Sequence, residues 1–150
     1  MIYSKACEYA IRALAYLARP DAKPHARAKE IARSENLPLP VLGKILQGLV
    51  RAFRGPGGGV ELGRSPEAIT LAALVHAVEG DVTGEDCALG LGECSEVAPC
   101  RVHARWAPLR SEFRRLLEET SLDTQADSEE VRRAWNSAPM ANTRHSTLKG

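Results

Sequence analysis

Three cysteines and one histidine lie close together in the chain, at Cys87, Cys94, Cys100 and His103. Six residues separate the first two cysteines, five separate the second from the third, and two separate the third from the histidine. Three thiolates and an imidazole can surround a zinc ion or fill the outer coordination positions of an iron–sulfur cluster. Zinc knuckles usually space their cysteines about two to four residues apart. The longer spacings therefore favour a loop wrapped around a bulky group over the tight knuckle of a zinc ribbon, and both an iron–sulfur cluster and a zinc ion stay open.

The rest of the sequence indicates where these thiols work. Met1 is not followed by the apolar stretch of a signal peptide, and no apolar run approaches the roughly 20 residues of a membrane-spanning helix. We therefore expect a cytoplasmic protein without membrane contact, and in that reducing compartment clustered cysteines are more often metal ligands than disulfides. No Ser-His-Asp triad or carboxylate pair is recognisable, and the RGPGGG segment lacks the Gly-Lys-Ser/Thr of a phosphate-binding loop. We expect no enzymatic activity.

Length and composition indicate one small, mainly helical domain. Of the 150 residues, 44% are hydrophobic but only 5% are aromatic, which suits packed helices better than a sandwich or barrel. Charge is segregated along the chain: residues 1–66 carry a net positive charge, whereas residues 67–100 contain neither lysine nor arginine. The basic segment is suited to a polyanion such as DNA.

The first 62 residues have the pattern of a winged helix-turn-helix. Ser4 is placed to cap a helix over 5–18, whose polar face carries Lys5, Glu8 and Arg12. A second helix is predicted over 26–35, and Pro40 suits the first turn of a third. A glycine-rich turn at 54–59 then enters a short strand.

In the third helix, apolar and polar residues fall on opposite faces. The apolar face holds Val41, Leu42, Ile45, Leu46 and Leu49, and the polar face holds Lys44, Gln47 and Arg51. We expect this polar face to meet DNA.

The second half of the chain divides into four parts. A fourth helix over 70–79 completes a DNA-binding domain of residues 1–80, and a cysteine-rich loop follows at 81–99. Residues 100–120 are predicted to form a dimerisation helix, and the polar segment 121–150 a disordered tail. The helix carries a short apolar seam at helical spacing, formed by Val102, Trp106, Leu109, Phe113 and Leu116.

A further set of motifs runs from the first helix to the cysteine loop. They are Ser4-Lys5, Glu8-Tyr9-Ala10, Ala13-Leu14, Leu17-Ala18, Glu30-Ile31-Ala32, Leu42, Lys44-Ile45-Leu46, Arg54-Gly55-Pro56-Gly57-Gly58-Gly59, Ile69-Thr70-Leu71, Val78-Glu79-Gly80 and Cys100-x2-His103-x2-Trp106. Together they resemble the Rrf-type winged-helix regulators, a family that includes the iron–sulfur cluster regulator, the nitric-oxide-sensing repressor and the rhizobial iron regulator. The resemblance implies a homodimer that binds palindromic promoter DNA and changes affinity with the state of a cluster.

The resemblance also implies which residues hold the cluster. Cys87, Cys94 and Cys100 match the family's cysteine ligands. The fourth ligand is His103 in some relatives, whereas others use a carboxylate of the partner subunit's first helix, at the position of Glu8. Both two-iron and four-iron clusters occur in the family, so the cluster type stays open.

The DNA-binding residues follow from charge and position. Lys5, Lys44, Arg51 and Arg54 are expected to contact phosphates, and Gln47 to contact a base. Gly57 and Gly58 belong to the turn of the wing, beside Arg54, where an arginine can enter a minor groove. Relatives commonly have several more residues between the third helix and this turn, so we expect a shortened first wing strand.

These observations predict a winged helix-turn-helix repressor with a long dimerisation helix, which responds to iron, redox or nitric oxide status. One alternative is a DNA-binding regulator that uses thiols or zinc without a cluster. A second alternative is an iron–sulfur protein of electron transfer or cluster handling that has lost DNA binding.

Overall fold

Helix α1, Lys5–Ala18, is central to the computed structural model, which describes residues 3–47, 49–80 and 87–126 together with residues 133 and 137. The helix has the predicted bounds. The Ser4 hydroxyl accepts a hydrogen bond from the Cys7 backbone N–H at 3.3 Å, and this cap begins the helix. Pro20 follows shortly after its end, where it disfavours further helical turns.

Helices α2, Ala28–Ser34, and α3, Leu39–Ile45, form the helix-turn-helix. Pro40 lies in the first turn of α3, as predicted. In the turn between the helices Asn36 adopts a positive φ of 51°, a conformation that asparagine tolerates better than most residues. Leu37 is buried beneath this turn and helps to fix the two helices together.

Strands β1, Val50–Phe53, and β2, Gly59–Leu62, pair as an antiparallel hairpin that forms the wing. Arg51 lies on β1 opposite Glu61, so its predicted place on the polar face of the third helix is wrong. Apolar residues continue beyond Ile45 at helical spacing, and the sequence pattern therefore extends the helix too far. The chain instead leaves the helix after Ile45 and pairs in the sheet from Val50 onward, where β1 and β2 have four residues each.

The wing is held against the segment that precedes α2. The Val60 N–H donates to the Ala26 carbonyl at 2.8 Å, and the rings of His25 and Phe53 stack with their centroids 4.0 Å apart. A Cβ at Gly59 would lie only 2.0 Å from the His25 carbonyl oxygen. Glycine is therefore required for this close approach of two backbones.

Helix α4, Leu71–Glu79, follows the short 3-10 turn η1, Pro66–Ala68. Thr70 caps its start by accepting from the Ala73 N–H at 3.2 Å, and Gly80 ends it with a φ of 78°. Both ends agree with the sequence prediction.

Helix α5, His103–Glu119, contains Pro108 and contacts α4 near its C-terminal end. Leu117 is 2% exposed and Phe113 packs against the core, whereas Leu109 and Leu116 are 63% and 59% exposed. The predicted seam is thus divided between the core and an uncovered face.

Helix α6, Leu122–Ala126, corrects the prediction of a disordered tail from residue 121. Leu122 is fully buried, and its N–H donates to the Ile69 carbonyl at 2.9 Å while the Leu71 N–H donates to the Thr120 carbonyl at 2.8 Å. These bonds join the chain to the start of α4, and α6 packs against α1. The helix is too short for its pattern to be recognised in the sequence. The rest of the predicted tail, apart from residues 133 and 137, lies outside the described residues.

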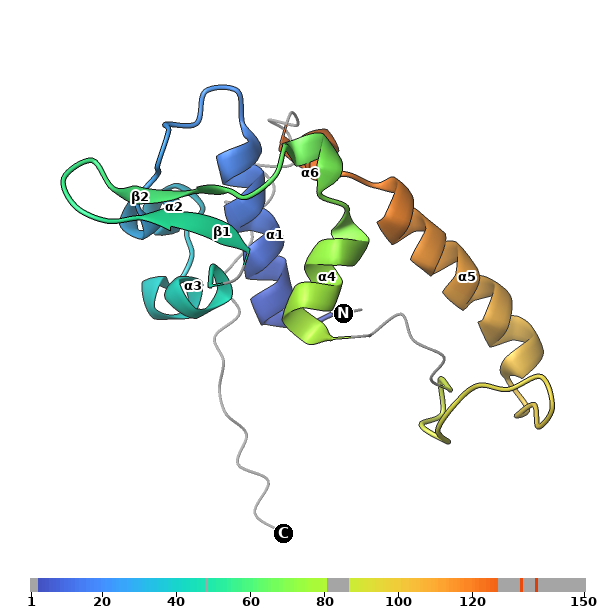
Figure 1. The fold of residues 1–150 in the computed structure, drawn as a ribbon. Coiled ribbons are helices and arrows are strands. Elements are labelled where there is room, and N and C mark those ends of the chain that lie inside the picture. The colour runs from blue at the N-terminus through green and yellow to red at the C-terminus, as the bar shows by residue number, and fades with distance from the viewer. Residues whose placement is uncertain (1–2, 48, 81–86, 127–132, 134–136, 138–150) are drawn as a thin grey trace, which may run out of the picture.

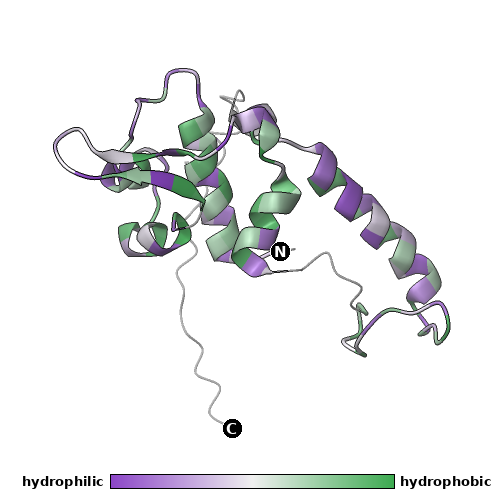
Figure 2. Ribbon diagram, in the orientation of Figure 1, coloured by the Kyte–Doolittle hydropathy of each residue, from purple (hydrophilic) through white to green (hydrophobic). Residues whose placement is uncertain are grey.

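The core is formed mainly by α1 and the helices around it, and Figure 2 shows hydrophobic residues concentrated on α1 and α4, whereas α5 is mostly hydrophilic. Arg12, expected on the polar face of α1, is only 5% exposed. Its guanidinium donates to the main-chain carbonyl of Glu35, and the Glu35 carboxylate pairs with Arg19. The prediction failed for Arg12 because its partner is distant in the sequence.

Figure 1 shows α2, α3 and the hairpin on one side of α1, and α4 and α5 on the other. Helix α5 diverges from the body, and the cysteine loop lies at its far end. Within the described ranges, no helix combines the length and the hydropathy needed to cross a bilayer.

Candidate functional site

The four predicted ligands form two close pairs near the start of α5. The Sγ atoms of Cys87 and Cys100 are 3.5 Å apart, and the Sγ atom of Cys94 is 3.1 Å from Nδ1 of His103. The sequence predicts a helix from residue 100, but α5 begins only at His103. Cys100 precedes the helix and faces Cys87 instead.

Backbone hydrogen bonds position these side chains. The Cys87 N–H donates to the Gly92 carbonyl at 2.8 Å, and the Gly90 N–H donates to the Cys87 carbonyl at 2.9 Å, which closes a tight turn after the first cysteine. The His103 N–H donates to the Cys100 carbonyl at 3.0 Å. The site therefore joins a turn to the first residue of a helix. Residues 81–86 of the predicted loop lie outside the described residues.

The surroundings favour the deprotonated form of Cys87. The backbone N–H of Leu89, 3.5 Å from its sulfur, lowers the pKa of the Cys87 thiol, and contacts with Cys100 and Leu91 act in the same direction. Thiolates, not thiols, bind metals. At the neighbouring pair, Nε2 of His103 lies 3.4 Å from the carboxylate of Glu96.

Three apolar side chains in the same loop as this polar site are exposed to solvent. Leu89, Leu91 and Val97 are 55%, 70% and 94% exposed. Isolated exposed apolar residues are common on proteins, so these exposures do not by themselves define a contact surface.

The predicted DNA-binding residues lie on the side of α1 that carries the hairpin. Lys44 is exposed on α3, Gln47 is exposed in the turn that follows it, and Arg51 and Arg54 are exposed on the wing. At the tip, Gly57 is exposed and Gly58 is half-buried.

Lys5 differs from the other predicted phosphate contacts. Its ammonium forms an ion pair with Glu8 at 2.6 Å on the first turn of α1. The pair is half-buried, and a phosphate that binds Lys5 has to compete with this carboxylate. Glu8 is the alternative fourth ligand, and in its own chain it contacts Lys5 at the start of α1.

The sequence analysis missed the residues that hold the wing in place. His25 has no ligand-type neighbour in the sequence, yet it stacks on Phe53, and its Nε2 lies 3.4 Å from Glu61. Its φ of 57° is unusual for a residue other than glycine. The only signal available was Pro24 before it, which marks a turn without indicating its partner.

Comparison with known proteins identifies the family. A family model described as Rrf2, iron-dependent transcriptional regulator, matches residues 3–128. A protein of Aquifex aeolicus described as an HTH-type transcriptional regulator is 33% identical over 137 residues, covering 87% of this chain and 94% of that protein. The HTH-type transcriptional regulator IscR of Salmonella agona is 32% identical over 102 residues, covering 65% of this chain and 62% of IscR.

The fold agrees with these matches. The structure of CymR, the global cysteine regulator of B. subtilis, has a TM-score of 0.67 and 26% identity, covering 82% of this chain and 94% of CymR. The winged helix-turn-helix and the long helix α5 are therefore those predicted from the sequence motifs. Since the family model spans most of the chain and a relative matches along nearly its whole length, the chain belongs to the Rrf2 family of transcriptional regulators.

Proposed function

We propose that this Rrf2-family regulator is a homodimeric repressor that senses iron, redox or nitric oxide status through an iron–sulfur cluster held by Cys87, Cys94, Cys100 and His103. The observations that carry the proposal are two contacts near the start of α5, between the sulfurs of Cys87 and Cys100 and between the sulfur of Cys94 and Nδ1 of His103. The similarity to IscR and the family description give independent support.

The donor set fits a two-iron cluster better than a single zinc ion. Each iron of a two-iron cluster takes two protein ligands, and the donors form one pair of two sulfurs and one pair of sulfur and nitrogen. Zinc requires donors within about 2.0–2.3 Å of one point. Among the described residues, no three Cys, His, Asp or Glu side chains form such a group. We therefore favour the two-iron cluster.

His103 connects the ligand set to the scaffold, because it is both a ligand candidate and the first residue of α5. A bound cluster supplies a centre that oxidants, nitric oxide or iron shortage can alter. The protein would hold that centre through three thiolates and an imidazole. These ligands would also order the cysteine turn against α5. Losing the ligand contacts frees this turn and the first turn of the helix together.

The dimer follows from the uncovered face of α5. Leu109 and Leu116 are two helical turns apart and largely exposed, so a second copy of the helix can cover both. In each chain the cysteine site lies far from that chain's own wing (Figure 1). We propose that the signal reaches DNA by changing the arrangement of the two subunits.

Anaerobic purification tests this function directly. The wild-type protein should show visible absorbance with matching iron and sulfide contents. Cys87→Ala, Cys94→Ala and Cys100→Ala should each abolish both while remaining folded helical dimers.

Cys7→Ala is the matched control. Burial and the charge of Glu79 raise the pKa of the Cys7 thiol to about 11, and the residue belongs to the core, so this variant should keep the cluster. Wild-type cluster content in any of the three loop variants removes that cysteine from the ligand set. If the wild-type protein is colourless and carries zinc, the proposal of an iron–sulfur cluster is wrong.

A thiol–disulfide switch is the second candidate, favoured by the 3.5 Å separation of the Cys87 and Cys100 sulfurs. Hydrogen peroxide can accept two protons and two electrons from these thiols, which gives one S–S bond and two water molecules. The similarity to CymR, a global cysteine regulator, also supports this candidate.

Peroxide treatment of the cluster-free protein distinguishes the two candidates. A thiol switch predicts that wild type and Cys94→Ser lose two hydrogen atoms by mass spectrometry, that Cys100→Ser does not, and that DNA affinity changes with the disulfide. If DNA affinity follows cluster content and ignores peroxide in the cluster-free protein, the second candidate fails.

A further inference from the structure

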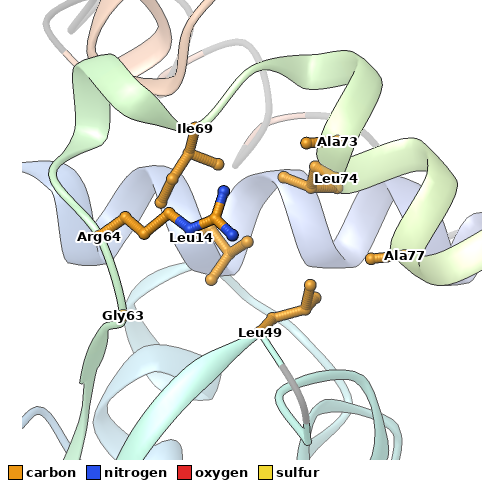
Figure 3. Close-up of a pocket in the computed structure, with 8 residues that line it drawn as sticks. All are labelled: Leu14, Leu49, Gly63, Arg64, Ile69, Ala73, Leu74 and Ala77. Atoms are coloured by element: carbon orange, nitrogen blue, oxygen red, sulfur yellow. The ribbon is translucent and has the colours of Figure 1, made fainter.

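A cavity of about 270 Å³ lies between α1, α4 and the base of the wing, far from the cysteine site. Figure 3 shows the residues that line it, which are Leu14, Leu49, Gly63, Arg64, Ile69, Ala73, Leu74 and Ala77. Leu14 and Leu74 are each 1% exposed and belong to the protein core. The cavity is therefore apolar at its base and reaches the surface between the wing and α4.

Arg64 supplies the single charge in this lining. Figure 3 shows its side chain extending across the cavity, with the guanidinium beside Leu14. In the described part of the chain no carboxylate lies within ion-pair distance of Arg64, and no hydrogen bond uses its guanidinium. The group is exposed, and all five of its donor hydrogens are available.

We propose that this cavity binds a small molecule with an apolar body and one carboxylate group. The aliphatic lining accepts the apolar body, and the guanidinium can form two parallel hydrogen bonds with the carboxylate. The volume lies just below the range of about 300–1,000 Å³ typical of drug-sized ligands, so the ligand is small. A cation is excluded by Arg64, and a purely polar anion gains nothing from the leucines.

The position of the cavity links this ligand to DNA binding. Leu49 immediately precedes β1, whereas Gly63 and Arg64 immediately follow β2. A molecule in the cavity therefore touches both ends of the hairpin as well as the core helices α1 and α4. Its binding constrains the wing relative to the body, and we expect it to change DNA affinity independently of the cysteine site.

Titration of the full-length protein with octanoate, compared with 1-octanol, tests the binding site. Octanoate should bind saturably and shift the backbone NMR signals of Gly63, Arg64 and Ala77 first. Arg64→Gln should weaken octanoate binding about tenfold, because a charge-assisted hydrogen bond is lost, and leave 1-octanol binding unchanged. The matched control Arg33→Gln, on the exposed face of α2, should change neither affinity.

A second variant keeps the test decisive if Arg64→Gln disturbs the fold. Ala77→Leu fills the cavity from the exposed side of α4, so it should abolish binding of both probes while preserving the helical spectrum. Saturating octanoate should change the Kd for a promoter fragment severalfold in wild type and not in Ala77→Leu. Octanoate binding that keeps its wild-type affinity in Arg64→Gln, that persists in Ala77→Leu, or that never saturates overturns the site. Unchanged DNA affinity in saturating octanoate overturns the link to the wing.

Discussion

Glu35 brings a negative charge into the interior at the end of α2. Its side chain is 1% exposed, its carboxylate pairs with Arg19, and its main-chain carbonyl accepts from Arg12. One oxygen of the carboxylate, Oε2, has no hydrogen-bond partner. Removing one member of a buried ion pair leaves the other charge uncompensated. The free-energy cost of that lone charge exceeds the net stabilisation that the pair contributes.

Glu35→Ala should therefore lower the free energy of unfolding by about 3–5 kcal/mol, measured by urea denaturation of the cluster-free protein. Glu67→Ala is the matched control, because Glu67 is exposed in η1, and it should change stability by less than about 0.5 kcal/mol. A loss below about 1 kcal/mol in Glu35→Ala would show that water reaches the pair.

The identity of the fourth ligand is a second prediction at the scale of single residues. His103 already lies 3.1 Å from Cys94, whereas Glu8 is paired with Lys5 in its own chain. Using His103 needs no rearrangement between subunits and so costs less ordering. His103→Ala should change the visible spectrum and speed cluster loss more than Glu8→Ala after parallel reconstitution. The reverse order would assign the ligand to Glu8 and make the site span two subunits.

Among the elements, the wing depends most on close backbone contact. A Cβ at Gly59 would lie 2.0 Å from the His25 carbonyl oxygen, whereas at Gly63 nothing lies within 4 Å of such an atom. Gly59→Ala should therefore separate the wing from the segment before α2 and weaken promoter binding at least tenfold in a fluorescence-anisotropy titration. Gly63→Ala should leave both the wing and the affinity unchanged. Equal affinities of the two variants would show that DNA binding does not need this contact.

The elements also show what local sequence can and cannot predict. Helix α1 was predicted with its observed bounds, because Ser4 and Pro20 are local start and stop signals. The end of α3 was wrong because strand pairing with a later segment outweighs a helical pattern. Spacing singled out Cys87, Cys94, Cys100 and His103 as one candidate site. Which of these residues lie in contact depends on where α5 begins, which no local signal marks.

At the scale of the whole molecule, the exposed seam of α5 predicts the oligomeric state. Leu109→Glu combined with Leu116→Glu should convert the dimer into monomers in sedimentation velocity, because two like charges replace the apolar contact in each helix. Ser111→Glu is the control, since Ser111 is also exposed on α5 but lies outside the seam, and it should stay dimeric. A dimer that persists in the leucine variant would place the subunit interface elsewhere.

Helix α5 has the geometry of a lever arm. It has 17 residues and is therefore about 25 Å long, and its core contact, Leu117, lies near one end. A tilt of about 5° at that end displaces the cysteine site by roughly 2 Å, as follows from the length of the arm. Conversely, a small force at the cysteine end of α5 produces a large torque at its other end. There it acts on the hydrogen bonds that join residues 69–71 to residues 120–122. A local change at the four side chains of the cysteine site can therefore exert a large torque on the contacts between α5 and the core.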